Sequence, residues 1–266
     1  MNLVRILATA AEQPQQQSVR EPHTADGNRQ AASANAPGDP HMARARQERA
    51  EITRQSILDG AAIAFDRFGF GAASLSDVVK HAGVTKGALY FHFQSKEALA
   101  RTLMDEQFQV SEGVPAIEEP GLQTVIDLTH QMAHGLRSSV RIRAAIRLVL
   151  EFGSFTNPDP TPYNIWIDTA FGCLKPAQDR GDVLPSLDLY DLSTFLVGSF
   201  TGIQVTSHVR TGRGDLHTRI VDLWNFLLPG IVPAGRLPRF DPAGSPACRA
   251  ELGLTTTPDS VAVAVG

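Results

Sequence analysis

The chain has 266 residues, of which 42% are hydrophobic and 20% are charged, and its formal net charge is −4. This composition is typical of a globular protein long enough for two modest helical units, and the net charge excludes a polycation. No apolar run approaches the roughly 20 residues that span a bilayer, and the N-terminus lacks the architecture of a signal peptide. The two cysteines, Cys173 and Cys248, have the spacing of neither a metal site nor a redox motif. We therefore expect a cytoplasmic protein without a structural disulfide, a metal or a cofactor.

Residues 1–41 are rich in Gln, Ala, Pro and Asn and have almost no periodic apolar content. Such a segment cannot bury enough surface to offset the entropy lost on ordering it, so we expect a disordered extension. Met42 begins the basic stretch MARARQERAE. This leaves two interpretations open, a working extension or a translation start at Met42.

The first predicted helix ends near Gly69, because glycine suits the C-terminus of a helix. Four arginines lead into this helix, and they either contact nucleic-acid phosphates or face solvent. They are Arg44, Arg46, Arg49 and Arg54. The inner face of the helix is marked by one apolar stripe, formed by Leu58, Ala61, Ala62, Phe65 and Phe68.

Residues 74–96 carry the strongest local signals in the chain. Ser74 and Asp77 are spaced as a capping box at the start of a short helix, and Gly83 supplies the positive φ that a sharp turn requires. Thr85 can cap a second helix whose first residues are small or basic. A short helix, a glycine turn and a helix with a slim, donor-bearing N-terminus predict a helix-turn-helix, whose second helix enters the major groove of DNA.

The stretch GVTKGALYFHFQSKEAL, residues 83–99, resembles the DNA-binding signature of TetR-type repressors. The resemblance implies an all-α, TetR-like fold with a three-helix DNA-binding domain over residues 42–96. We expect Thr85, Lys86, Gly87 and Ala88 to approach base edges, and Tyr90, His92 and Lys96 to hold phosphates. The alternative is a helical hairpin inside a larger bundle, which leaves the slim surface at the start of the second helix unexplained.

A longer helix, capped by Ser95 and running to about Val110, is expected to link this domain to a ligand-binding and dimerisation domain over residues 97–236. Arginines at 141, 143 and 147 lie off the apolar face of their helix and are expected to face solvent. Pro176 should kink or shorten its helix, and Pro229 should end the last one. The chain after about Leu237 is rich in Pro, Gly, Ala and Thr, so residues 237–266 are expected to form a loose tail. The five helices predicted in the second domain span residues 121–137, 140–152, 163–180, 187–208 and 215–228.

Three motifs of the second domain resemble the γ-butyrolactone receptors of actinobacteria, a TetR subgroup: RAAIRLVLEFG (143–153), FLVGSFTGIQ (195–204) and LWNFLLPGIVP (223–233). The resemblance covers roughly residues 42–236, and it places Trp166 in the ligand pocket. A lactone with an alkyl arm needs apolar walls and one or two hydrogen-bonding groups.

The polar candidates for this pocket are Gln107 and Thr201. The apolar candidates, each of which is equally suited to an ordinary core, are Val125, Ile126, Met132, Ile146, Val149 and Phe152.

These features predict a homodimeric repressor of a palindromic operator that a small lactone releases. The resemblance implies that it regulates secondary metabolism. Residues 187–228 are expected to pair the subunits, with Gly198, Ser199 and Gly202 permitting close approach. One alternative is a pseudo-receptor that responds to an antibiotic or a biosynthetic intermediate. The other is a helical small-molecule-binding or catalytic protein with no DNA role. The sequence offers little support for an enzyme, because His130 and His134 lack the intervening Glu of a zinc-protease motif and no nucleotide-binding loop is present.

Overall fold

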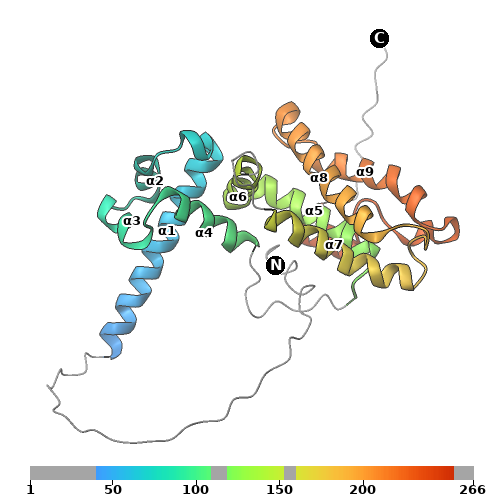
Figure 1. Cartoon of the computed structure of the whole chain (residues 1–266), viewed down its shortest axis with the longest axis horizontal. Coiled ribbons are helices and arrows are strands. Elements are labelled where there is room, and N and C mark those ends of the chain that lie inside the picture. The colour runs from blue at the N-terminus through green and yellow to red at the C-terminus, as the bar shows by residue number, and fades with distance from the viewer. Residues whose placement is uncertain (1–39, 109–118, 153–159, 255–266) are drawn as a thin grey trace, which may run out of the picture.

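The computed structural model describes residues 40–108, 119–152 and 160–254. Within these ranges every regular element is a helix, which confirms the all-α fold class. None of the described helices is both long and apolar enough to cross a membrane. Figure 1 shows a smaller N-terminal body and a larger C-terminal body.

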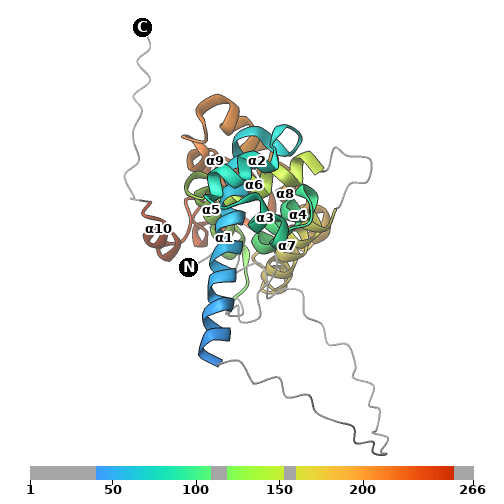
Figure 2. The same ribbon diagram turned by 90° about the vertical axis from the view of Figure 1, so that its left-hand side faces the viewer.

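The smaller body is a cluster of four helices that share one apolar core. Figure 2 shows the N-terminal part of the first helix projecting away from the rest of the molecule. The helices are α1 (Pro40–Ala72), α2 (Leu75–Ala82), α3 (Lys86–His92) and α4 (Lys96–Phe108). Each contributes fully buried side chains, among them Ile57, Leu58, Phe65, Val78, Leu89, Leu99 and Leu103.

The first helical stretch of α1 ends at Gly69, as predicted. Gly69 has the non-helical backbone angles φ 76 and ψ 170, and a separate short helical stretch follows it to Ala72. Phe68, expected on the inner face, is 38% exposed, and its ring centroid lies 5.1 Å from the guanidinium carbon of Arg67. The bend at Gly69 turns Phe70 into the core in its place, where Phe70 is 9% exposed.

Gly60 sets how closely α1 and α2 pack. A Cβ atom at this position would lie 2.6 Å from both the Ala82 nitrogen and the Val78 carbonyl oxygen, and backbone atoms cannot move aside as a side chain can. We expect Gly60→Ala to destabilise the protein by about 2 kcal/mol, despite alanine's higher helix propensity, because overpacking costs about 1–3 kcal/mol. Chemical denaturation checks this. Gly71→Ala is the matched control, since a Cβ at Gly71 meets no atom within 4 Å, and it should cost nothing.

α6 (Val140–Phe152) belongs to both bodies. Ala144 and Leu148 are fully buried in the core of the smaller body. Ile146 and Val149, on the opposite side of the same helix, are buried in the core of the larger body. A displacement of α6 therefore disturbs the packing of both bodies.

Three arginines join α6 to α1, contrary to the expectation that they face solvent. Arg141 Nε donates to Asp59 Oδ1 at 2.7 Å, and Arg143 Nε donates to Asp66 Oδ2 at 2.9 Å. Arg147 donates to the backbone carbonyl of Asp66 at 2.7 Å. The prediction was wrong because the sequence pattern of α6 does not show that α1 brings its acidic face against these residues.

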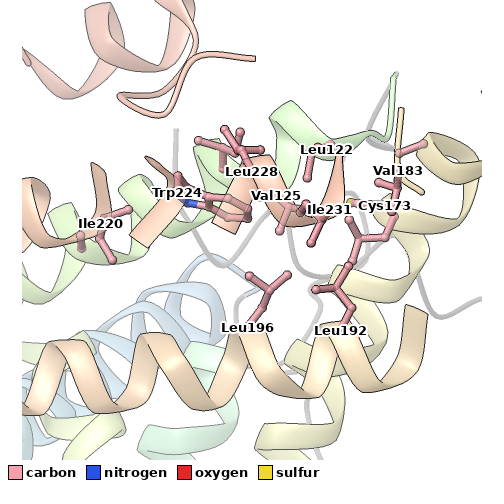
Figure 3. Close-up of a cluster of buried hydrophobic side chains, with 14 of the residues drawn as sticks. Leu122, Val125, Cys173, Val183, Leu192, Leu196, Ile220, Trp224, Leu228 and Ile231 are labelled. Carbon is pink, nitrogen blue, oxygen red and sulfur yellow. The ribbon is translucent and has the colours of Figure 1, made fainter. Parts of the chain in front are cut away.

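In the larger body, α9 packs against both α5 and α8. Figure 3 shows Trp224 and Leu228 of α9 close to Val125 of α5, and Leu192 and Leu196 of α8 pointing toward them from the other side. Besides α6, the helices of this body are α5 (Leu122–Ser138), α7 (Thr161–Asp179), α8 (Leu189–Thr211) and α9 (Leu216–Ile231).

Pro176 and Pro229 interrupt their helices less than expected. α7 runs through Pro176 to Asp179, and α9 runs through Pro229 to Ile231, so the predicted end before Pro229 is wrong. The backbone of Leu184 donates to the Ile231 carbonyl at 2.8 Å, and Ile231 itself is buried. These contacts offset the hydrogen bond that a proline inside a helix loses.

The C-terminal segment, residues 234–254, packs onto α5, so the expected loose tail is wrong for this part. Ser245 donates to the Asp127 carboxylate from its backbone nitrogen at 2.7 Å and from its hydroxyl at 2.6 Å. Cys248 is 4% exposed. Residues 255–266 lie outside the described ranges, as do residues 1–39 of the predicted 1–41 extension; residues 40 and 41 already belong to α1. The elements of the segment are η3 (Ala234–Arg239) and α10 (Pro246–Leu252).

Two stacked histidines lie under this segment. His130 Nε2 is 2.9 Å from the Pro242 carbonyl oxygen, so Nε2 carries the proton and Nδ1 is the acceptor. Nδ1 of His130 lies 3.3 Å from Nδ1 of His217, which must therefore donate. His217 Nε2 is buried and has no partner among the described residues. Burial lowers the pKa of both imidazoles, which favours these neutral forms in the folded protein.

The histidine pair predicts that stability falls on acidification. Burial, aided by repulsion from the protonated forms of His130 and His134 and from Arg137, lowers the pKa of His217 from 6.5 to about 4. The unfolded chain takes up this proton below about pH 6.5 and the folded chain only near pH 4, so stability is lost as the pH falls through that window. We expect the thermal midpoint to drop between pH 7 and pH 4.5 and the drop to be smaller in His217→Gln. An equal drop in both proteins would contradict this assignment.

Candidate DNA-binding surface and ligand cavity

The turn between α2 and α3 has the geometry that its local sequence signals predict. Ser74 and Asp77 form the capping box of α2, and Gly83 adopts the left-handed conformation with φ 65. Thr85 caps α3 by accepting from the Ala88 nitrogen at 3.1 Å. Leu89 is fully buried and anchors α3, so the opposite side of this short helix faces outward.

The residues predicted to contact DNA gather on that outward side. Thr85, Lys86, Gly87 and Tyr90 are exposed, and Ala88 and His92 are half-buried. A Cβ at Gly87 would meet nothing closer than the Thr85 hydroxyl at 4.0 Å, which leaves the N-terminus of α3 open to close approach. The geometry suits insertion of α3 into a groove.

Lys96 has a different setting from the other predicted contacts. Its ammonium donates to the carbonyls of Phe70 at 2.7 Å and Ala73 at 3.1 Å, and it lies 4.4 Å from the ring centroid of Phe70. Lys96 therefore fastens the start of α4 to the end of α1. A phosphate contact by this residue stays a prediction.

Sequence reasoning missed Phe91, which is 80% exposed on α3. Its ring lies edge-on to that of His92, with the centroids 5.0 Å apart. The spacing of the apolar residues could have indicated its exposure. Leu89 and Phe93, one turn apart, occupy the inner face of α3, so the residue midway between them must point outward.

An apolar cavity of about 100 Å³ lies in the larger body. Its walls come from α5, α6, α7 and α8. Six of the predicted ligand-binding residues line it: Val125, Met132, Ile146, Val149, Trp166 and Thr201.

Three predicted ligand-binding residues lie elsewhere. Ile126 is fully buried in the core of the larger body and does not line the cavity. Gln107 lines a separate polar cavity of about 330 Å³ together with His134 and Glu251. The side chain of Phe152 lies outside the described residues. The cavity is thus built mainly from α5 to α8, with no contribution from the described part of α4.

The polar groups of the cavity come largely from residues that sequence reasoning missed. The Thr201 hydroxyl donates to the Val197 carbonyl at 2.8 Å. Burial raises the pKa of Tyr163, and a hydrogen bond with Thr201 partly offsets the rise. Gln204 is 2% exposed and also lines the cavity. Helical spacing could have indicated both, because Tyr163 lies three residues before Trp166 and Gln204 three after Thr201.

Trp166 stands beside this polar group. Its ring packs edge-on against Tyr163, with the centroids 5.3 Å apart. The cavity therefore combines a flat aromatic wall, aliphatic side chains and a small cluster of oxygen atoms at one side. Such a lining favours a small, mostly apolar ligand with one or two polar atoms.

Comparison with known proteins agrees with this geometry. Residues 57–103 match the family model described as "Bacterial regulatory proteins, tetR family". Residues 119–233 match "Tetracyclin repressor-like, C-terminal domain". The A-factor receptor protein of Streptomyces griseus is 41% identical over 202 residues, which cover 75% of this chain and 71% of the receptor. The chain belongs to the TetR family.

Solved structures of TetR-family proteins resemble this chain as well. A γ-butyrolactone receptor described as ArpA-like is 33% identical, covers 77% of this chain and 98% of its own, and has a TM-score of 0.62. CprB from Streptomyces coelicolor, solved with its biological operator sequence, is 32% identical, covers 78% of this chain and 100% of its own, and has a TM-score of 0.64.

Membership of the TetR family confirms the prediction of a ligand-responsive repressor. Proteins of this family are DNA-binding regulators and not enzymes, so the helical binding protein or enzyme without a DNA role is set aside. The two family models match up to residue 233, which leaves the whole C-terminal segment outside them.

Proposed function

We propose that the protein is a homodimeric repressor that leaves its operator when a γ-butyrolactone-type signal enters the apolar cavity. The observation that carries this proposal is the position of α6, which supplies Ile146 and Val149 to the cavity and Ala144 and Leu148 to the core of the DNA-binding domain. We expect it to act in the cytoplasm on operators of secondary-metabolism genes, as the named relatives suggest.

An exposed apolar stripe on α8 supports a dimer. Phe195 and Val209 are 57% and 79% exposed, and they lie on the same helical face as Gly198 and Gly202. A Cβ at either glycine meets no atom within 4 Å. On α9, Phe226 is 84% exposed. Pairing this surface about a two-fold axis would bury it and provide the two reading heads that a palindromic operator requires.

The relatives' names and the cavity support a lactone as the signal. An apolar arm suits the aliphatic side chains and the face of Trp166, and a lactone or hydroxyl oxygen suits Tyr163 and Thr201. A cavity of about 100 Å³ is smaller than the roughly 300–1,000 Å³ of most ligand pockets. The ligand would therefore have to push the surrounding helices apart.

Expansion of the cavity would link ligand binding to release of the operator DNA. A displaced α6 would shift α1 through Arg143 and its ion pair with Asp66, and it would shift α4, which packs on it. The distance between the two α3 helices would change, and operator half-sites one turn apart tolerate little error in their spacing of about 34–36 Å. A difference in affinity worth about 3 kcal/mol would shift the balance roughly a hundredfold.

The test is selection of duplexes from a random DNA pool, followed by mobility-shift titration with lactones of increasing alkyl length. We expect palindromic sequences to be enriched, and an alkyl-substituted γ-butyrolactone to release them while the unsubstituted ring does not. Release by an aromatic antibiotic intermediate but by no lactone would support the pseudo-receptor instead. A monomer by analytical ultracentrifugation, with no palindrome selected, would contradict the proposed dimer.

A further inference from the structure

A basic hollow of about 380 Å³ lies where the DNA-binding domain meets the turn between α8 and α9. It is separate from the ligand cavity. We call it the arginine pocket, and its charged and imidazole side chains are Asp66 of α1, Arg137 of α5, Arg143 of α6, and His208 and Arg213 of the α8–α9 region.

The arginine pocket carries an excess of positive charge. Three guanidinium groups face one carboxylate, that of Asp66, among the described lining residues. This carboxylate already accepts from Arg143 Nε at 2.9 Å. Arg137 and Arg213 are left without a carboxylate of their own in the hollow. An anion that entered would meet about two uncompensated positive charges.

Arg213 is held in a costly backbone conformation. Its φ of 70 makes it the one non-glycine residue with positive φ in the described part of the chain. It directly follows Gly212, which also has positive φ, and its nitrogen donates to the Ser207 carbonyl at 3.2 Å. Glycine adopts this conformation without the steric cost that arginine bears. An arginine at this position is therefore explained by a role of its side chain.

The guanidinium of Arg213 is only partly satisfied. One terminal nitrogen lies 3.1 Å from His208 Nδ1, and the other donates to the Gln204 Oε1 atom at 3.3 Å. The Nε atom is buried and has no hydrogen-bond partner among the described residues. Arginine has five N–H donors, so more than half of them are uncommitted. Because Arg213 donates to His208 Nδ1, the Nε2 atom of His208 is a further donor. Burial lowers the pKa of Arg213, and burial and the charge of Arg213 lower that of His208.

We propose that the arginine pocket binds a small oxyanion, for which a phosphate group of a metabolite is the best match. A phosphate monoester carries a charge of about −1.5 to −2 at pH 7 and offers three acceptor oxygens, which matches both the charge excess and the donors of Arg137, Arg143 and Arg213. The bound anion would bridge α1 of the DNA-binding domain and the α8–α9 turn. This site does not depend on the lactone proposal, and its test uses no lactone.

The experiment is calorimetric titration of the full chain with inorganic phosphate in chloride buffer at constant ionic strength, supported by thermal unfolding. We expect saturable binding to the wild type and at least tenfold weaker binding to Arg213→Gly. The same variant should unfold at an equal or higher temperature in plain chloride buffer, because glycine relieves the strained backbone. A well-folded Arg213→Gly with unchanged phosphate affinity would overturn the proposal, as would a wild type that shows no saturable binding.

Asp66→Asn is the complementary variant. It removes the one carboxylate of the pocket, so phosphate should bind it severalfold more tightly than it binds the wild type. Weaker or unchanged binding would overturn the charge argument. If Arg213→Gly lost operator affinity and the wild type gave no saturable phosphate signal, the arginines would belong to a DNA-phosphate contact and the metabolite site would be refuted.

Discussion

Gly87→Leu should weaken operator binding at least a hundredfold, about 3 kcal/mol, while leaving the fold intact. The position has open space in the free protein, since a Cβ there meets only the Thr85 hydroxyl at 4.0 Å. A leucine side chain would therefore project from the N-terminus of α3 without disturbing the core. It would meet bases or backbone only when α3 enters the groove, and so its cost falls on the complex.

Anisotropy titration with a labelled, selected operator at fixed salt measures this effect, and circular dichroism confirms folding. Gly235→Leu is the matched control, because Gly235 is also exposed, has no atom within 4 Å of a Cβ and lies far along the chain from α3. It should bind like the wild type. Normal operator affinity in Gly87→Leu would refute the proposed approach of α3 to DNA.

Trp166→Ala should leave operator affinity within about twofold and raise the lactone concentration needed for release at least a hundredfold. The indole supplies the flat wall of the cavity beside Tyr163, and its removal takes away both contact area and the ordered shape of the site. The residue lies in the larger body, away from the core of the DNA-binding domain. Its loss therefore acts on the ligand-bound state.

Trp224→Phe is the control for this prediction. Trp224 is fully buried and its Nε1 donates to the Thr129 hydroxyl at 2.9 Å. Replacing it should reduce stability by about 1–2 kcal/mol but preserve release by the lactone. Dose–response curves for release, measured on both variants, compare the two residues. A Trp166→Ala protein that still responds at the wild-type concentration would place the ligand elsewhere.

The local signals of the DNA-binding unit could be interpreted from sequence because their causes are local. A capping box at Ser74, a positive φ at Gly83 and a helix cap at Thr85 involve atoms only a few residues apart. The six cavity residues found in advance had a similar basis, since apolar spacing on each helix indicates which side chains point inward. Spacing does not separate a cavity wall from a plain core, which is why Ile126 was grouped with Val125.

The features that escaped prediction depend on contacts between distant parts of the chain. Asp127 holds Ser245 across 118 residues of sequence, and a Pro- and Gly-rich composition alone suggests only a loose tail. The ion pairs of the α6 arginines could not be predicted for the same reason, because their partners Asp59 and Asp66 lie on α1. The sequence likewise does not show that the Lys96 ammonium donates to the backbone carbonyl of Phe70 in α1.

The central claim is that occupation of the α5–α8 cavity and release of DNA are one linked event. The most direct measurement uses the Trp224→Phe protein, whose remaining tryptophan is Trp166. A lactone is titrated into its complex with labelled operator while tryptophan fluorescence and operator anisotropy are recorded together. The account predicts that both signals change over the same concentration range, with one lactone bound per chain. Saturation of the Trp166 signal while the operator stays bound would contradict it.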